Sequence, residues 1–569
     1  MNILKSLLTQ SPRLNRVLRI GRVSGAIRLP VASTRPYSVL KVLEFLPNQL
    51  APKCKSCGVQ LQNEDKEKPG FYRIETGEKK NPKKDLDSVY QKALRSLSEE
   101  DQKMLSGGKS VELHLQKNEA ADNSKDDTKI ECIRCREIKF HSRFDSSQFP
   151  IESPMKVLEK IPPWAQLVYV VSAQDFPLLL DSKVFELWPA RQIQFVITKA
   201  DLLFPNNKSA QEKGLRFFQD YLERTYHIPR EQVFIVSGHV NWGISNLLGS
   251  LKDDSFFIGS VNCGKSTLLQ SLIYVTHLIR SKLPNAKRER EMQKDEDHLG
   301  HTAIARKRIK ELTKFKEQNG PGVSYMPGFT RSVIPIELSP TKTAFDVPGF
   351  GASDSNSFYE ILGPAALKKL LKGVKFHKNG MYNSHYDTVK AGLTLTVGGL
   401  FFLTIPPNCM YRVKNLVNHP MHVFRNMDKA VHSWKHQSEN PALKDVFLTD
   451  SSNTDLIRYE IPPFTGSFDL VIKNFGFLNI TATGKMPDPM PPIFIYLPRQ
   501  VSAVSRDPIA KFITKSFTGR DKNGNPLKKE NIVRLSTKEI KRYVGHQQLI
   551  RPLIWAQETG DLSQSLKKT

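Results

Sequence analysis

Residues 259–266 read Gly-Ser-Val-Asn-Cys-Gly-Lys-Ser, which is a complete GxxxxGKS phosphate-binding loop. The apolar run at residues 255–258 precedes it and a helix start follows at residue 267, so the loop has the strand–loop–helix context that this motif needs. A second motif, Thr-Lys-Ala-Asp at residues 198–201, follows the apolar run at residues 193–197 and so ends a strand. These stretches predict an α/β domain that binds a nucleotide.

The phosphate-binding loop assigns a role to each of its polar positions. Gly259 and Gly264 allow backbone N–H groups to turn toward the phosphates, and the positive end of the following helix adds to the attraction. We expect Lys265 to reach the β- and γ-phosphates and the Ser266 hydroxyl to ligate Mg²⁺. Thr267 begins the helix beside them and completes the predicted phosphate contacts.

The motif at residues 198–201 predicts which base is bound. The Asp201 carboxylate accepts hydrogen bonds only. Guanine offers it two donors, N1–H and the 2-amino group, and adenine has neither. We expect the Lys199 stem to pack along the nucleotide, and Thr198 replaces the more common Asn while keeping a hydroxyl. After the strand expected at residues 232–236, Ser237 stands where GTPases contact guanine O6. The sequence therefore predicts GTP and GDP as ligands.

Two further motifs are typical of the switches of a GTPase. Asp-Val-Pro-Gly at residues 346–349 predicts that Asp346 holds Mg²⁺ through water and that the Gly349 N–H senses the γ-phosphate. Pro-Gly-Phe-Thr at residues 327–330 makes Thr330 the predicted second Mg²⁺ ligand. Each tetrapeptide alone could be an ordinary turn, but their consistent order favours the switch interpretation.

The order of the motifs indicates a circular permutation. In ordinary GTPases the TKxD or NKxD motif follows the phosphate-binding loop, whereas here it precedes the loop. Because the ends of a compact domain often lie close together, the chain can be cut and rejoined without loss of the sheet.

The sequence predicts slow hydrolysis. Phe350 follows Gly349, where many small GTPases have Gln, and a phenyl ring cannot orient water by hydrogen bonding. Unassisted turnover on the order of 10⁻⁴–10⁻² per second is expected. Asn262 matches an asparagine that coordinates potassium in related GTPases; the alternative is that it only fills the loop.

Four of the six cysteines form two CxxC pairs, Cys54 with Cys57 and Cys132 with Cys135. Four thiolates suit tetrahedral Zn²⁺, with disulfides or free thiols as the alternatives. The charged segment at residues 74–129 separates the pairs, and its role cannot be read from the sequence; the same holds for the charged segment at residues 287–316.

The first 43 residues have the composition of a mitochondrial presequence. They contain eight Lys or Arg, several Ser and no acid before Glu44, and cleavage by the matrix peptidase is expected after Tyr37. The alternative is a basic arm that binds RNA. The whole chain carries a net charge of +27, which favours a polyanionic partner such as RNA or the ribosome. No apolar run is long enough to cross a membrane, while peripheral contact with the inner membrane through the basic surface stays open.

These motifs, with residues 54–61, 69–71 and 393–400, resemble the YqeH family of circularly permuted GTPases, in a fungal mitochondrial branch. The resemblance covers nearly the whole chain after the presequence. It implies a treble-clef-like zinc domain, a permuted Ras-like domain and a C-terminal domain that binds RNA or protein. It also implies work in assembling the small ribosomal subunit.

We therefore expect four parts. These are a presequence (1–37), a treble-clef-like zinc domain with its charged insert (38–148), a circularly permuted P-loop GTPase domain (149–365) and an α+β domain with a basic tail that binds RNA or the ribosome (366–569). Within the last part, residues 393–403, 468–472 and 477–482 predict strands, residues 487–498 a proline-rich connection and residues 538–543 a basic helix.

The main hypothesis is a GTP-hydrolysing assembly factor for the mitochondrial small ribosomal subunit, located in the matrix. Its nucleotide state would switch its binding to ribosomal RNA or the ribosome. The alternative is a GTP-binding RNA chaperone or scaffold with little intrinsic hydrolysis. Single-turnover hydrolysis with and without small subunits separates the two.

Overall fold

The structure is a computed structural model, and it describes residues 52–72, 131–138, 151–281, 303–324, 328–351, 361–378, 381–382, 385–443, 445–449, 451, 455–461, 463–464, 466–509, 550–552 and 554–555. The predicted presequence, the whole of the insert at 74–129 and the predicted basic helix at 538–543 lie outside these residues.

A six-stranded, mostly parallel sheet forms the α/β half of the described chain. Its order is β3-β2-β1-β4-β6-β5, and only the edge strand β5 runs antiparallel. The strands are β1 (Gln166–Ser172), β2 (Ile193–Thr198), β3 (Val233–Ile235), β4 (Asp254–Ile258), β5 (Ile334–Glu337) and β6 (Thr343–Asp346). Every residue of β1 and β2 is buried, as expected for central parallel strands covered on both faces. The strands predicted before both nucleotide motifs are thus confirmed.

The strand order brings distant motifs to one edge. Strand β1 pairs with β2 on one side and with β4 on the other, both in parallel, and β4 pairs in parallel with β6. The carboxyl ends of β2, β4 and β6 therefore meet at the same edge of the sheet. That edge is where open α/β sheets bind ligands.

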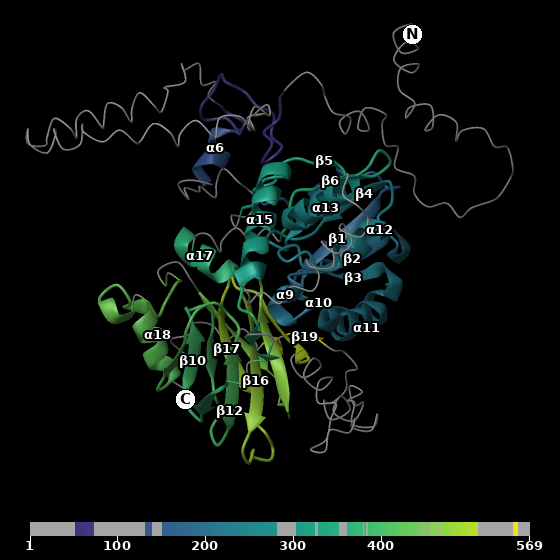
Figure 1. Cartoon of the computed structure of the whole chain (residues 1–569). Helices are drawn as coiled ribbons and strands as arrows, with labels where there is room; N and C mark the ends of the chain where they lie inside the picture. Colours follow the sequence, from purple (N-terminus) through teal and green to yellow (C-terminus); the bar gives the residue numbers. More distant parts are fainter. Residues whose placement is uncertain are drawn as a thin grey trace, which may run out of the picture. The chain divides into compact units, whose positions relative to one another are not determined.

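Helices connect these strands, and Figure 1 shows them in the blue and teal part of the ribbon. Helix α13 follows the phosphate-binding loop and packs against α15, with the Tyr274 and Phe315 rings 5.3 Å apart. Helix α15 covers the helix predicted at 305–316. The helices of this half are α7 (Pro154–Leu158), α8 (Ser182–Leu187), α9 (Ala200–Leu203), α10 (Asn207–Ser209), α11 (Leu215–Tyr226), α12 (Ile244–Ser250), α13 (Lys265–Arg280) and α15 (Ala303–Asn319).

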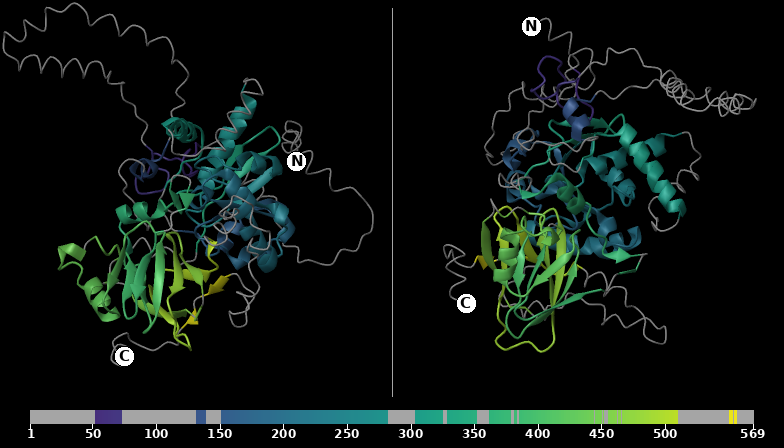
Figure 2. Two further views of the ribbon diagram at one scale, coloured as in Figure 1. Left: turned by 60° about the horizontal axis from the view of Figure 1, so that its bottom comes forward. Right: turned by 90° about the vertical axis from the view of Figure 1, so that its left-hand side faces the viewer.

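Two six-stranded antiparallel sheets make up most of the C-terminal half. Their orders are β13-β10-β11-β17-β14-β20 and β19-β18-β15-β16-β12-β9, and Figures 1 and 2 show them in green to yellow. The strands are β9 (Asp387–Lys390), β10 (Thr394–Val397), β11 (Phe402–Thr404), β12 (Met410–Asn415), β13 (Met421–Phe424), β14 (Leu456–Ile461), β15 (Ser467–Ile472), β16 (Gly476–Thr483), β17 (Ile493–Pro498), β18 (Ala503–Arg506), β19 (Ile550–Pro552) and β20 (Ile554–Trp555). Short strands β7 (His377–Lys378) and β8 (Met381–Tyr382) form a separate pair, and the helices are α17 (Pro364–Leu371) and α18 (Met427–Lys435).

One expectation for this half is wrong. Residues 487–498 are not simply a proline-rich connection, because residues 493–498 form β17, which pairs with β11 and β14. Ile493, Ile495 and Leu497 are buried while Phe494 and Tyr496 are only half-buried, which is the alternation of a strand with one face on the core. The prolines lie before the strand and at its last position, where no central ladder bond is lost. The boundary expected at 365/366 falls inside α17.

A buried ion pair joins the C-terminal sheets to the α/β half. Arg506 contacts the Asp469 carboxylate at 3.3 Å, and neither side chain is exposed. The Arg506 guanidinium also donates to the backbone carbonyls of Ala173 and Phe176, at 3.2 and 2.6 Å. These contacts fix the β-rich half beside the loop that follows β1.

Among the described helices, none combines the length and the apolar character that crossing a bilayer requires.

Candidate nucleotide and metal sites

The phosphate-binding loop and the Thr-Lys-Ala-Asp motif at residues 198–201 are in direct contact. The Thr198 hydroxyl donates to the backbone carbonyl of Cys263, 65 positions away and inside the phosphate-binding loop, at 2.5 Å. A Cβ added to Gly264 would lie 3.5 Å from the same hydroxyl oxygen. Thr198 thus makes this contact with its hydroxyl, where the more common residue has an amide. The expected proximity of the two segments is observed.

The phosphate-binding loop has a conformation that depends on its glycines. Gly259 has φ 151° and Gly264 has φ 98°, and a Cβ on Gly259 would collide with the carbonyl oxygen of Val170. The Lys265 ammonium lies inside the loop, donating to the carbonyls of Gly259 at 3.0 Å and Ser260 at 3.2 Å. The loop therefore holds a buried positive charge at its centre.

Asp346 gathers the residues expected to bind Mg²⁺. Its Oδ2 accepts from the Ser266 hydroxyl at 2.9 Å and from the Thr330 hydroxyl at 3.5 Å. Its Oδ1 is buried and has no hydrogen-bond partner among the described residues. Burial raises the pKa of Asp346 to about 6, while the Lys265 charge and the two hydroxyls act in the opposite direction. Two hydroxyls around a carboxylate with an unpartnered oxygen fit a hard cation such as Mg²⁺.

The Asp-Val-Pro-Gly segment packs directly against the phosphate-binding loop. The Phe350 N–H donates to the carbonyl of Gly259 at 3.3 Å, and the Val261 N–H donates to the carbonyl of Phe350 at 3.1 Å. A Cβ on Gly349 would lie 3.2 Å from the Lys265 Nζ. The Phe350 ring is buried and packs against Tyr169. Gly349 is thus beside the loop, and the Phe350 ring belongs to the core.

Asp201 and Ser237 also meet. The Ser237 hydroxyl donates to Asp201 Oδ1 at 2.6 Å, and both residues are buried. Asp201 lies in the first turn of α9, and Lys199, the residue before this helix, has φ 58°. The Asp201 carbonyl also contacts His377 Nε2 at 3.0 Å. The predicted base-reading residues therefore form one cluster, held from outside by the start of the C-terminal half.

A pocket of about 360 Å³ opens beside the phosphate-binding loop, within the usual size range for small-ligand sites. Most of the predicted phosphate and switch residues line it: Lys199, Asn262, Gly264, Lys265, Ser266, Thr267, Thr330 and Gly349. Other predicted residues do not form its wall: Thr198, Asp201, Ser237, Gly259 and Asp346. Pro327 lies outside the described residues.

Two lysines of this pocket were missed by the sequence reasoning. Lys368 and Lys372 line it from α17 and the residue after it, together with Leu371. Their spacing of four places them on one face of a helix whose Leu367 and Leu370 are buried, and this pattern was the available signal. The chain after α17 is tied to the base-reading side, since the Phe376 N–H donates to the carbonyl of Leu202 at 2.7 Å.

The four paired cysteines converge as predicted. Their ligand atoms lie within 4.8 Å of one another, and all four side chains are buried. Cys54 Sγ lies 3.8 Å from Cys135 Sγ, and Cys57 Sγ lies 3.9 Å from Cys132 Sγ. A tetrahedron of Zn–S bonds of about 2.3 Å has edges of about 3.8 Å, so the donor set fits Zn²⁺. Hydrogen bonds among the four thiols lower the pKa of Cys54 and Cys132 and raise the pKa of Cys57 and Cys135, so a bound metal would have to displace protons from the second pair.

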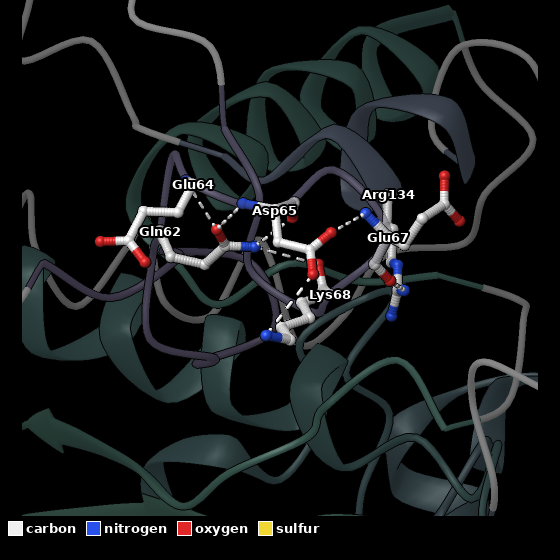
Figure 3. A network of polar contacts seen from close by, with 6 residues as sticks. All are labelled: Gln62, Glu64, Asp65, Glu67, Lys68 and Arg134. Atoms are coloured by element: carbon white, nitrogen blue, oxygen red, sulfur yellow. Dashed lines mark hydrogen bonds and ion pairs between the residues drawn. The ribbon is translucent and has the colours of Figure 1, made fainter.

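Local hydrogen bonds build this cysteine site. The Gly58 N–H donates to the Cys54 carbonyl at 2.9 Å and closes the first CxxC turn, while Cys135 lies on the short helix α6 (Ile133–Arg136). Figure 3 shows how Gln62 organises the next loop: its side-chain oxygen accepts from the Asp65 N–H at 2.9 Å. Arg134 donates to the Glu67 carbonyl at 2.7 Å and so ties α6 to that loop.

Comparisons with known proteins place the chain in a family. Residues 53–149 match the model of the genetic interactor of prohibitins 3 N-terminal domain, and residues 384–560 match that of its C-terminal domain. Three relatives named "Genetic interactor of prohibitins 3, mitochondrial" illustrate the similarity. The Clavispora lusitaniae protein is 44% identical over 526 residues, covering 90% of this chain and 85% of the relative. The Debaryomyces hansenii protein is 41% identical (92% and 91% covered), and that of Candida albicans strain SC5314 is 32% identical (84% and 83%).

The names of these relatives support a mitochondrial location, and the expected fungal mitochondrial resemblance is confirmed. The chain belongs to the genetic interactor of prohibitins 3 family.

Proposed function

We propose that the α/β half is a circularly permuted Ras-like GTPase domain that binds Mg²⁺–GTP. The observation that carries the proposal is the hydrogen bond from Thr198 to the carbonyl of Cys263. It joins the strand end that leads to Asp201 with the loop that would hold the phosphates. One nucleotide can then contact both, although their order in the chain is reversed.

Each residue has a role in this proposal. Lys265 leaves the loop carbonyls to bind the β- and γ-phosphates, and the loop N–H groups bind them from the other side. Ser266 and Thr330 would ligate Mg²⁺ directly, and Asp346 would hold it through water. These two hydroxyls already contact the Asp346 carboxylate, so the residues that would hold the metal are gathered at one point. Bound there, Mg²⁺ would supply positive charge against the phosphates.

We propose that hydrolysis is slow and stimulated by potassium or by the ribosome. The Phe350 ring is in the core and supplies no group that orients water. Asn262 lines the pocket with φ 60°, and its Nδ2 has no hydrogen-bond partner among the described residues. Its side-chain oxygen would ligate K⁺ beside the phosphates. The cation would add the positive charge that an arginine supplies in other GTPases.

The proposed biological role is assembly of the small ribosomal subunit in the mitochondrial matrix. A net charge of +27 suits a protein that contacts ribosomal RNA. Helix α17 contributes to the nucleotide pocket through Lys368 and to the C-terminal core through Leu367 and Leu370. A ligand in the pocket therefore acts on the element that connects it to the proposed RNA-binding half. The nucleotide state would control binding through this helix.

A second function is a GTP-binding RNA chaperone or scaffold with little hydrolysis, whose basic surface would also allow peripheral contact with the inner membrane. The burial of Phe350 favours it, because no hydrolytic side chain replaces the missing Gln at that position. Single-turnover hydrolysis with and without mitochondrial small subunits distinguishes the two. Stimulation by the subunit supports the assembly factor, and its absence at full GTP occupancy supports the scaffold.

Nucleotide binding is tested by titrating the full chain with fluorescent GTP in Mg²⁺ buffer, with ATP as the competitor. We expect competition by GTP and GDP but not by ATP, and loss of binding in Lys265→Ala. Full GTP affinity in that variant would contradict the proposed site. Hydrolysis rates in potassium and sodium buffers test Asn262, and equal rates would reject its role.

A further inference from the structure

The segment that carries Thr330 is attached to the first cysteine pair. The backbone N–H of Arg331 donates to the carbonyl of Cys57 at 2.9 Å. The Ser332 hydroxyl donates to the carbonyl of Gly58 at 2.5 Å. On the other side of Thr330, the Phe329 ring packs against the buried cysteine cluster. Thr330 is therefore flanked on both sides by contacts with the four-cysteine region. The contacts of Arg331 and Ser332 are with the turn at residues 54–59, which we call the cysteine knuckle.

The same segment leads directly to Asp346. Ile334 begins β5 and lies opposite Asp346 in the antiparallel register with β6. Ile334 lies only four positions after Thr330, whose hydroxyl contacts Asp346 Oδ2 at 3.5 Å. The cysteine knuckle contacts residues 331 and 332, and strand β6 pairs with the segment from Ile334 onward. Both sets of contacts fix the position of the Thr330 hydroxyl beside Asp346.

The fit between knuckle and segment leaves no room for an added methyl group. Gly58 has φ 79°, and a Cβ there would lie 2.5 Å from the Ser332 hydroxyl oxygen and 2.8 Å from Ile334 Cγ1. A Cβ on Gly322 would lie 2.6 Å from the Phe329 ring and 2.8 Å from Ser56 Cβ. Approaches this close mean that a change in the shape of the knuckle must displace the segment.

We propose that the cysteine knuckle is the positioning element for the Mg²⁺-binding threonine, with Ser332 as its positioning residue. This inference rests on the proposed GTP function. A four-thiolate metal site fixes the knuckle, and the carbonyls of Cys57 and Gly58 then hold Thr330 where Mg²⁺ needs it. GTP binding would require that placement, because Mg²⁺ held by Thr330 would contact the γ-phosphate of GTP. GDP has no γ-phosphate and would not depend on it.

The coupling between nucleotide binding and metal binding must act in both directions. If the metal-loaded knuckle favours GTP over GDP, then GTP must stabilise the metal in the knuckle by the same factor. Loss of one hydrogen bond changes an equilibrium by about 3- to 10-fold, which sets the expected size of the effect. Zinc retention therefore gives a readout that is independent of hydrolysis.

The test compares Ser332→Ala with Ser332→Thr, which keeps the hydroxyl, and with Ser339→Ala as a matched control. Ser339 closes the turn after β5 by accepting from the Lys342 N–H at 3.0 Å. We expect Ser332→Ala to weaken binding of a non-hydrolysable GTP analogue by about 3- to 10-fold. GDP affinity and zinc content should not change. Ser332→Thr should restore the analogue affinity, and Ser339→Ala should match the unaltered protein.

The second measurement is the equilibrium affinity for zinc, from competition with a colorimetric chelator of known affinity, with Mg²⁺ and either GDP or the GTP analogue present. We expect the unaltered protein to bind zinc about 3- to 10-fold more tightly with the analogue than with GDP, and this difference to shrink in Ser332→Ala. Equal zinc affinity with both nucleotides, or equal weakening of GDP binding and analogue binding in Ser332→Ala, would overturn the positioning role. If the unaltered chain binds no GTP at all, the proposed function fails instead.

Discussion

The Ser266 hydroxyl lies 2.9 Å from the Asp346 carboxylate, although 80 positions separate the two residues in the chain. Ser266 follows strand β4 and Asp346 ends strand β6, and these strands pair side by side in parallel. The contact is therefore a direct consequence of the sheet topology. It places the hydroxyl and the carboxylate of the proposed Mg²⁺ site next to Lys265, the lysine proposed to bind the phosphates.

The first prediction concerns the charge on Asp346 in metal-free protein. Burial raises the pKa of this carboxyl from 3.8 to about 6. The folded protein then holds the proton more tightly than the unfolded chain does. The resulting stability is fully present below pH 3.8 and is lost as the pH rises through about 6. Asp346→Asn, which stays neutral, should raise the free energy of unfolding at pH 8 by up to about 3 kcal/mol.

Thermal unfolding in chelator at pH 5 and pH 8 measures this effect, which should be about twice as large at pH 8 as at pH 5. With Mg²⁺ and GTP present, the unaltered protein should instead be more stable than Asp346→Asn, because the Asn amide cannot replace the carboxylate as a partner of the cation. A variant that is less stable than the unaltered protein at pH 8 without metal would contradict the buried, costly carboxylate.

The second prediction concerns the hydrogen bond between the two motifs. Thr198→Val removes the hydroxyl and leaves the carbonyl of Cys263 without that donor. A buried carbonyl left unpaired costs about 1–3 kcal/mol, so urea unfolding should show a loss of this size. Thr198→Ser retains the hydroxyl and serves as the control. Equal stability of the two variants would show that the contact does not support the loop.

Much of the α/β half could be predicted from the sequence, because each of its motifs and apolar runs can be recognised within a short stretch of the chain. Continuous apolar runs predict β1 and β2, and Gly259 to Ser266 predict a loop whose chemistry depends on few neighbours. Strand β17 was missed because the prolines before it hide a period of two. The docking of the knuckle on Ser332 could not be predicted, since 274 positions separate Gly58 from Ser332 and no pattern in either segment marks the partner.

The third prediction concerns the lysines of α17. Lys368 and Lys372 bring positive charge to the pocket. Replacing both with Ala should therefore weaken GTP binding several-fold and change GMP binding little. Lys369→Ala is the matched control, because this exposed lysine is on the same helix but does not line the pocket. The effect should fall at high salt, as exposed charges are screened. Identical losses for GTP and GMP would rule out phosphate contacts.

The fourth prediction concerns metal content. The full chain should bind one Zn²⁺ at the four cysteines, and Cys132→Ser should lose it because one of four thiolates is missing. Elemental analysis of the purified proteins measures this directly, with Cys409→Ser as the control cysteine outside the cluster. Full zinc content in Cys132→Ser would show that the metal is held elsewhere.

The most direct measurement is the base preference of Asp201→Asn. Xanthine presents a carbonyl where guanine has its 2-amino donor, and an Asn amide can donate to it where Asp can only accept. If one nucleotide lies between Asp201 and the phosphate-binding loop, the variant should bind xanthosine triphosphate more tightly than GTP, and adding Lys265→Ala should abolish both. Unchanged GTP affinity in Asp201→Asn would show that this carboxylate does not read the base.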